Sequence, residues 1–339
     1  MRTSATRRWC RHWWLHGLVL LALCLTSAGI WADESDPEAL NLLRETGEQA
    51  EHLHYQGILV YRHGSELETL RVIHRGGSEQ ERSERFYSLT GTPREVIRKP
   101  DEVICILPDA EAVVVDRRQL RNPISEAIPD RPETLDTAYQ VSLGGMDRVA
   151  GRDAQTVLIA PRDELRFGHK LWIDREHGLL LRADLLDDQH QALEQVMFTE
   201  VSLVESVPDA WLEPGTSGES FSWLRPDERP DSDAVEPAWQ IAEPPPGFTL
   251  ISHRQRHLAG HDYPVEHLHF SDGLASVSVY VSPKEGTRAR ERRVRLGLMG
   301  AVRLLRDDVV ITVVGEVPPV TLHRFAEGLA AASPPEVEQ

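Results

Sequence analysis

Apolar and polar residues alternate with two different periods along this chain of 339 residues. From Ser35 to Gly57 the apolar residues recur at roughly helical spacing, at Leu40, Leu43, Ala50 and Leu53. Ser35 and Glu38 stand in capping-box spacing, and Pro37 suits the first turn of a helix. The pattern therefore predicts a helix that starts near Ser35, ends near Gly57 and packs one face on a sheet.

After this helix the apolar period falls to two. Short runs rich in β-branched and aromatic residues, separated by turns with glycine or proline, occupy 56–63, 67–74, 84–89, 95–98, 103–107, 112–116, 153–159, 169–174, 179–185 and 193–205. The stretch 122–136 is polar and contains prolines, which predicts a loop or a short helical excursion. Many short strands in succession indicate an antiparallel sheet that curls toward a sandwich or barrel.

The composition changes between residues 213 and 247, where seven prolines are interspersed with acidic residues and serines. Such a stretch is typical of a connector between domains. Beyond it, strand-like runs are found at 248–252, 265–270, 274–281 and 309–314. Pro318 and Pro319 then begin a helix with Leu322, Phe325 and Leu329 on one face. These elements predict a second, smaller α+β domain.

The first 32 residues have the pattern of a secretory signal peptide. Arginines 2, 7, 8 and 11 precede an apolar, uncharged run from 15 to 29, which is shorter than the roughly 20 residues that span a bilayer. Ala28 and Ala32 are alternative cleavage sites, and an uncleaved anchor is the alternative to cleavage. The predicted organisation is a signal peptide at 1–32, an N-terminal domain at 33–212, a linker at 213–247, a C-terminal domain at 248–332 and a tail at 333–339.

The net charge argues against nucleic acid as a partner. The formal charge is −17, and loss of the four arginines of the signal peptide makes it −21. Residues 284–306 run against this trend, with eight basic residues and two acidic ones. We interpret Arg288, Arg290, Arg292, Arg293 and Arg295 as a patch that docks lipid phosphates or an acidic partner segment, since arginine suits both. The alternative is an ordinary solvated face.

Motifs for catalysis and for metal binding are missing from the sequence. It contains no Gly-x-Ser-x-Gly, His-Glu-x-x-His or glycine-rich phosphate loop, which argues against an enzyme and predicts no cofactor. Cys105, the one cysteine outside the signal peptide, lies in an apolar run and is interpreted as a buried thiol of a strand. His253, His257 and His261 would share a helix face, but Pro264 and the strand-like flanks disfavour a metal site.

Several short segments of the sequence, taken in order, resemble segments of the RseB/MucB family. The longest are Tyr55–Tyr61, Glu68–His74, Asp147–Arg152, Phe167–Asp174 and Thr312–Pro318, and shorter ones are Pro93–Arg98, Cys105–Pro108, Pro245–Phe248 and Ser271–Ala275. The resemblance runs through nearly the whole chain after the signal peptide. It implies an N-terminal half-open antiparallel β-barrel with helices, like that of lipoprotein carriers, and a smaller C-terminal α+β domain.

The resemblance also implies a function. The protein would bind the periplasmic part of a membrane-spanning anti-sigma factor and shield it from regulated proteolysis. Lipopolysaccharide or mislocalised lipoprotein would release it. A periplasmic lipid or lipoprotein carrier is the alternative, although a carrier needs only the half barrel and this chain has a second domain. The sequence leaves monomer and homodimer open.

An acyl chain would need an apolar inner face of the half barrel. Strand alternation places one set of apolar residues inside, and we predict that this set includes Val60, Tyr61, Leu70, Val72, Ile104, Ile106 and Trp172, with Val157, Ile159 and Leu171 as further candidates. The alternative is that all of them are ordinary core residues, because a single sequence does not reveal which face of the sheet stays uncovered.

Overall fold

The computed structural model describes residues 34–116, 124, 127–215, 220–224, 232–233, 238–257, 263–284, 292–296 and 298–332. The predicted signal peptide, the tail 333–339, Arg288 and Arg290 lie outside these residues. Within the described part of the chain, no helix is long and apolar enough to cross a membrane.

The first helix, α1 (Pro37–Ala50), has its N-cap one residue later than predicted, at Asp36. The Asp36 side chain, and not Ser35, accepts the backbone N–H of Glu38, at 2.9 Å. The Ser35 hydroxyl accepts the N–H of Val141 instead, at 2.9 Å, and so joins the start of the helix to the sheet. The predicted capping box is therefore wrong, because the tertiary contact takes the hydroxyl.

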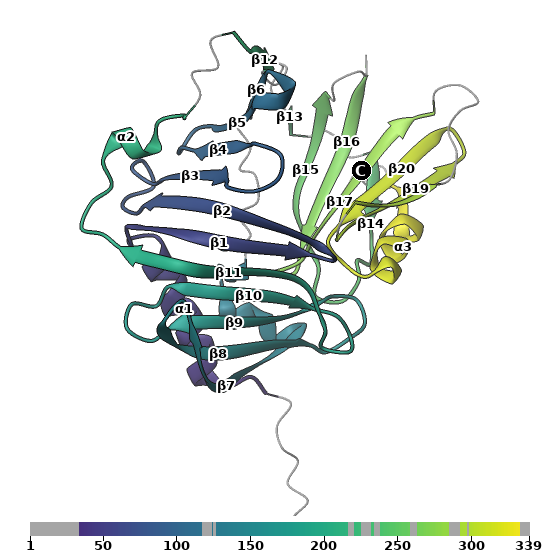
Figure 1. Cartoon of the computed structure of the whole chain (residues 1–339). Coiled ribbons are helices and arrows are strands. Elements are labelled where there is room, and N and C mark those ends of the chain that lie inside the picture. Colours follow the sequence, from purple (N-terminus) through teal and green to yellow (C-terminus); the bar gives the residue numbers. More distant parts are fainter. Residues whose placement is uncertain are drawn as a thin grey trace, which may run out of the picture. The chain divides into compact units, whose positions relative to one another are not determined.

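The N-terminal sheet contains twelve strands that do not close into a barrel (Figure 1). They are β1 (Tyr55–His63), β2 (Glu66–Arg75), β3 (Ser83–Ser88), β4 (Glu95–Arg98), β5 (Val103–Leu107), β6 (Ala112–Asp116), β7 (Tyr139–Val149), β8 (Arg152–Pro161), β9 (Gly168–Asp174), β10 (Leu180–Leu186), β11 (Ala192–Leu203) and β12 (Ser222–Leu224). Their order is β12-β6-β5-β4-β3-β2-β1-β11-β10-β9-β8-β7, and only β12 runs parallel to its neighbour. Among the described strands, β7 and β12 end the sheet without pairing with each other. The predicted half-open antiparallel barrel is confirmed.

The two faces of this sheet are covered differently. On one, which we call the helix face, Leu43 of α1 packs in a core with Leu59, Val72 and Phe198. On the other, the outer face, Ile73 packs against residues that follow β11. Two short 3₁₀ helices, Pro108–Ala110 and Pro132–Thr137, interrupt the connections between strands. The long connection between β6 and β7, predicted as a loop with some helical character, contains the second of them.

A strap crosses the outer face after β11. It contains the short helix α2 (Asp209–Leu212), whose first residue pairs with Arg75 at 2.6 Å. The Glu95 carboxylate accepts both the Arg85 guanidinium, at 2.5 Å, and the N–H of Gly215, at 3.0 Å. The chain then adds β12 to the sheet beside β6. Part of the proline-rich segment is therefore held on the N-terminal sheet.

The C-terminal domain is a second sheet with one helix. Its strands are β13 (Ser232–Asp233), β15 (Thr249–His257), β16 (Pro264–Ser271), β17 (Ser276–Pro283), β18 (Arg292–Leu296), β19 (Met299–Arg306) and β20 (Val309–Gly315), in the order β13-β15-β16-β17-β20-β19-β18. Two further strands, β14 (Trp239–Ile241) and β21 (Leu329–Ala331), pair with each other. The helix α3 (Pro319–Gly328) packs Phe325 against Phe248 and Phe270, with ring centroids 5.3 and 5.0 Å apart. The predicted C-terminal helix and α+β domain are confirmed, although Leu329 begins β21.

Apolar and hydrogen-bonding contacts attach this domain to the N-terminal one. Leu274, in the turn between β16 and β17, belongs to the apolar cluster that contains the core of the N-terminal sheet. The buried hydroxyl of Thr321 in α3 donates to the carbonyl oxygen of Leu165, at 2.6 Å. The domains are therefore joined through side chains as well as through the linker.

Candidate functional site

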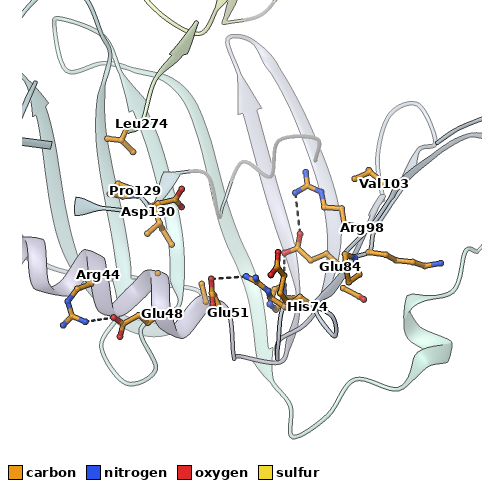
Figure 2. Close-up of a pocket in the computed structure, with 18 of the residues that line it drawn as sticks. Arg44, Glu48, Glu51, His74, Glu84, Arg98, Val103, Pro129, Asp130 and Leu274 are labelled. Atoms are coloured by element: carbon orange, nitrogen blue, oxygen red, sulfur yellow. Dashed lines mark hydrogen bonds and ion pairs between the residues drawn. The ribbon is translucent and has the colours of Figure 1, made fainter. Parts of the chain in front are cut away.

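A cavity of about 860 Å³ lies on the helix face of the N-terminal sheet (Figure 2). The last turns of α1 and strands β2–β5 form its walls. Residues of the turns before β3 and after β4, residues 128–130, and residues 273, 274 and 276 complete the lining. It is formed here because α1 covers only part of this face. The cavity is large enough for a small ligand or part of an acyl chain, and we take it as the starting point for a ligand site.

One wall of the cavity is a row of charged side chains. His74, Glu84 and Arg98 stand directly opposite one another on β2, β3 and β4. The Nδ1 of His74 lies 2.7 Å from Glu84, and Arg98 lies 3.7 Å from the same carboxylate. Tyr55 stacks on the ring of His74, with centroids 4.7 Å apart. The Glu84 carboxylate in this wall therefore already has a hydrogen-bonding and a cationic neighbour.

The rim of the cavity is also made of ion pairs. Arg44 pairs with Glu48 at 2.5 Å, and Arg82 pairs with Glu51 at 3.1 Å (Figure 2). The lining as a whole contains four basic and five acidic residues. An anionic head group would therefore meet no excess of positive charge inside the cavity itself, and its recognition requires a basic surface elsewhere.

A row of apolar residues lies beside the charged row on the same face of the sheet. On each of β2, β3 and β4 the apolar residue is two positions away from the charged one. Its members stand opposite one another from β2 to β6: Val72, Phe86, Val96, Cys105 and Val114. Val72 is buried, and the other four are half-buried. Leu224 of β12 extends the row and is 56% exposed. We call these six residues the apolar ladder.

The ladder has the chemistry that an acyl chain requires. A row of partly exposed apolar side chains can cover methylene groups, each contributing about 0.8 kcal/mol when buried. Burial raises the pKa of the Cys105 thiol, against the opposing effect of Arg94, so this thiol stays protonated as an apolar residue would require. Sequence reasoning missed the five ladder members other than Val72, because each strand shows only an ordinary alternation. Only the register between strands brings these residues into one row.

The seven residues predicted to contact lipid do not share a face. Tyr61, Leu70 and Val72 lie on the helix face, as the pairing of Leu70 with the core residue Leu59 shows. The register places the other four, Val60, Ile104, Ile106 and Trp172, on the outer face. The three further candidates are all fully buried on the helix face; they are Val157, Ile159 and Leu171. Lipid contact by any of these residues stays a prediction.

Trp172 is held by polar partners on the outer face. Its indole N–H donates to Asp147 at 2.8 Å, and its ring lies under Lys170 and Arg182, at 4.7 and 4.1 Å from the centroid. Ile104 and Ile106 pack with Ile97 in a separate small cluster. Ile104 and Ile106 therefore contribute to packing on the outer face, whereas Trp172, which the register places on that face, is buried and belongs to the main apolar cluster.

The arginine-rich segment is resolved into strands. Arg292, Arg293 and Arg295 lie in β18. Arg303 is exposed on β19. Arg306 is used internally, because its guanidinium donates to the carbonyl oxygens of Ala326, Glu327 and Leu329 at the end of α3. The segment thus combines a structural arginine with a basic strand at the margin of the sheet.

Other chemistry is not assembled in the described part of the chain. No three His, Cys, Asp or Glu side chains there are close enough to share one metal ion. His253, one of the three spaced histidines, contacts Glu266 at 2.6 Å. His257 belongs to the end of β15, and His261 lies outside the described residues. The predicted absence of metal and cofactor remains a prediction.

Two family models match this chain in succession. The MucB/RseB N-terminal domain matches residues 38–216, and the MucB/RseB C-terminal domain matches residues 233–330. The chain belongs to the MucB/RseB family. The predicted resemblance is confirmed over both domains of the fold.

Curated relatives of the family are similar over almost their full lengths. The sigma factor AlgU regulatory protein MucB of Pseudomonas aeruginosa is 33% identical over 313 residues, which cover 91% of this chain and 94% of MucB. The sigma-E factor regulatory protein RseB of Escherichia coli is 26% identical over 306 residues, which cover 86% of this chain and 91% of RseB. The two-domain organisation is therefore shared with regulators of sigma factors.

Solved structures of MucB agree with this membership. A crystal structure of MucB in complex with MucA(peri) matches with a TM-score of 0.69 at 30% identity, covering 87% of this chain and 100% of that chain. A crystal structure of MucB matches with a TM-score of 0.61 at 29% identity, covering 88% and 99%. The MucB/RseB fold thus accounts for both sheets described above.

Proposed function

We propose that this chain is a periplasmic regulator that binds the periplasmic region of a membrane-spanning anti-sigma factor. Binding would shield that region from regulated proteolysis and so restrain the sigma factor. The observation that carries the proposal is the match to MucB in its complex with MucA(peri), which extends over all of that MucB chain. Both domains of the family are present here.

We further propose that lipopolysaccharide or mislocalised lipoprotein releases the regulator. The apolar ladder supports this, because it offers acyl chains a partly open row of Phe86, Val96, Cys105 and Val114 beside the cavity. The balanced charge of the cavity lining leaves phosphate recognition to another surface. The arginine-rich segment is the natural candidate for an anionic group, whether from a lipid or from the partner.

The test is calorimetry with the mature chain, residues 33–339, and the periplasmic region of its cognate anti-sigma factor. We expect tight binding that lipopolysaccharide weakens, and slower cleavage of the bound region by its site-specific protease. Binding that lipopolysaccharide leaves unchanged would remove the lipid-release part alone. Absence of binding would contradict the regulatory function.

A periplasmic carrier of lipid or lipoprotein is the second candidate, favoured by the same ladder. It predicts stable retention of an acylated ligand without binding of the anti-sigma region. The assignment as a non-enzymatic binding protein rests on the family's regulatory names and on the sequence's lack of catalytic motifs. A homodimer in solution would appear as a doubled mass in light scattering.

A further inference from the structure

The strand β18 occupies one end of the C-terminal sheet. It pairs with β19 through Leu296 and Met299, which flank a two-residue connection, and the register continues to Arg292 opposite Arg303. On its other side, no strand of the described part of the chain pairs with it. The hairpin β18–β19 from Arg292 to Arg306 contains five arginines and no acidic residue. The sheet therefore ends in a basic edge.

The register of this hairpin pairs two of its arginines. Arg292 stands directly across from Arg303, and like charges in such a pair destabilise a sheet. Arg303 is exposed, so an approaching group can reach it. An anionic group that lies along the hairpin would convert this repulsion into attraction. The register itself thus points to an acidic ligand.

The backbone of β18 offers a second, independent element of recognition. In a two-residue hairpin the flanking pair exchanges hydrogen bonds, and bonded and non-bonded pairs then alternate. Leu296, Val294 and Arg292 therefore direct their N–H groups toward β19. Arg293 and Arg295 direct theirs toward the unpaired edge. A phosphate head group can accept one or two of these N–H groups, whereas an extended peptide can pair with the whole row of donors and acceptors.

We infer that the edge of β18 binds an extended acidic segment of the partner protein as an added strand. This inference rests on the proposed function and adds the location and form of the contact. The same arginines disfavour pairing between two copies of this strand, because like charges would then face each other. The edge is thereby selective for an acidic strand over a second copy of the chain.

A matched pair of variants separates strand pairing from charge. Arg293→Pro and Arg293→Thr both remove one positive charge, but only proline removes the outward N–H, and it leaves the hydrogen bonds to β19 in place. The probe is the periplasmic region of the cognate anti-sigma factor, titrated into the full mature chain at two salt concentrations. We expect Arg293→Pro to weaken binding about tenfold more than Arg293→Thr does.

Hydrogen exchange supplies the direct reading. In the wild-type complex the amides of Arg293 and Arg295 should become protected while that of Val294, already bonded to β19, changes little. Equal binding by the two variants, with no new protection at Arg293 and Arg295, overturns the strand-pairing inference but leaves the proposed function intact. If the wild-type chain does not bind the region, the proposed function fails with it.

Two controls complete the experiment. Thermal unfolding of Arg293→Pro should match that of Arg293→Thr, and a lower midpoint would direct the comparison to Arg295→Pro and Arg295→Thr instead. Vesicles of anionic phospholipid should not protect the Arg293 and Arg295 amides. Protection by vesicles together with none by the peptide would assign the edge to a membrane surface and contradict the inference.

Discussion

Arg166 and Asp272 form an ion pair in which neither side chain is exposed, with 2.6 Å between Nη1 and Oδ2. Arg166 follows β8 in the N-terminal domain, and Asp272 lies in the turn between β16 and β17 of the C-terminal domain. Asp163 accepts two further hydrogen bonds from the guanidinium, and the Tyr139 hydroxyl donates to Asp272 at 3.0 Å. Asp272 also accepts the N–H groups of residues 274 and 275. The junction between the domains is thus built on a buried charge whose hydrogen bonds are satisfied.

Removal of one partner from this pair should be costly. Asp272→Ala removes one of the two carboxylates that pair with the buried Arg166 guanidinium and leaves the buried Tyr139 hydroxyl without its acceptor. We expect a loss of about 3–5 kcal/mol in the free energy of unfolding. Urea denaturation followed by tryptophan fluorescence measures it. The matched control is Arg324→Ala, which removes the exposed pair between Arg324 and Glu164 at 3.4 Å. That variant should change stability by less than about 1 kcal/mol, and equal effects of the two would contradict the role of the buried pair.

The apolar ladder predicts which face of the half barrel takes acyl chains. Val96→Thr combined with Val114→Thr replaces two ladder methyl groups by hydroxyls at nearly constant volume. We expect acyl-chain binding to weaken about tenfold, from the loss of roughly 0.8 kcal/mol per methyl group and the added cost of covering a hydroxyl. Fluorescence titration with a dansylated fatty acid measures the change.

Val60→Thr is the control for the ladder, because Val60 is equally half-buried but lies on the outer face. It should leave acyl-chain binding unchanged. A larger effect from Val60→Thr than from the double ladder variant would move the lipid site to the outer face, where Trp172 and Ile104 also lie.

The contacts of Asp174 predict that the protein loses stability in acid. Burial raises the pKa of its carboxyl, but the hydrogen bond and charge of Arg152, 3.0 Å away, and the N–H of His177 outweigh burial, so its pKa lies below the ordinary value. A group with a lowered pKa in the folded state adds stability above its unfolded pKa of about 4 and loses it as the pH falls through the folded pKa. Wild-type protein should therefore lose more stability between about pH 4 and pH 2 than Asp174→Asn does.

Thermal unfolding midpoints of the two proteins across this range test the expectation, with Asp153→Asn as the control. Asp153 is exposed on β8, next to Arg152, and the unfolding midpoint of Asp153→Asn should depend on pH as that of the wild type does. Parallel curves for wild type and Asp174→Asn would show that the carboxyl is not linked to folding.

The contacts of Arg306 predict that this arginine of the basic segment stabilises the fold. Arg306→Ala leaves carbonyl oxygens at the end of α3 without their charged donor, and we expect a loss of about 1.5–3 kcal/mol in unfolding free energy. Guanidinium denaturation provides the measurement. Arg303→Ala, three residues earlier and exposed, should cost less than about 0.5 kcal/mol. If both variants unfold alike, the contacts of Arg306 do not stabilise the helix end.

Local patterns were sufficient for the elements themselves. Strand-period alternation predicted ten of the first eleven strands of the N-terminal sheet, all except β7, and helical spacing predicted α1 and α3. β7 was missed because its exposed half, with two glycines and Met146, has no apolar alternation. β18 was missed because three arginines in five residues hide its apolar period. The capping hydroxyl of Ser35 was misassigned because a distant strand competes for it.

The sequence by itself determined the two-domain α+β architecture, the family and the position of the arginines, since these depend on periodicity, composition and the order of short words. Only the tertiary structure decided which residues share a face. Alternation divides one strand into two sets, but it does not say which set of the next strand lies beside either of them. Val60 and Tyr61 are neighbours on β1 yet belong to opposite faces, whereas Phe86 and Val114 meet in one ladder across four strands. Cross-strand register is a long-range property, and the ladder, the cavity and the basic edge follow from it.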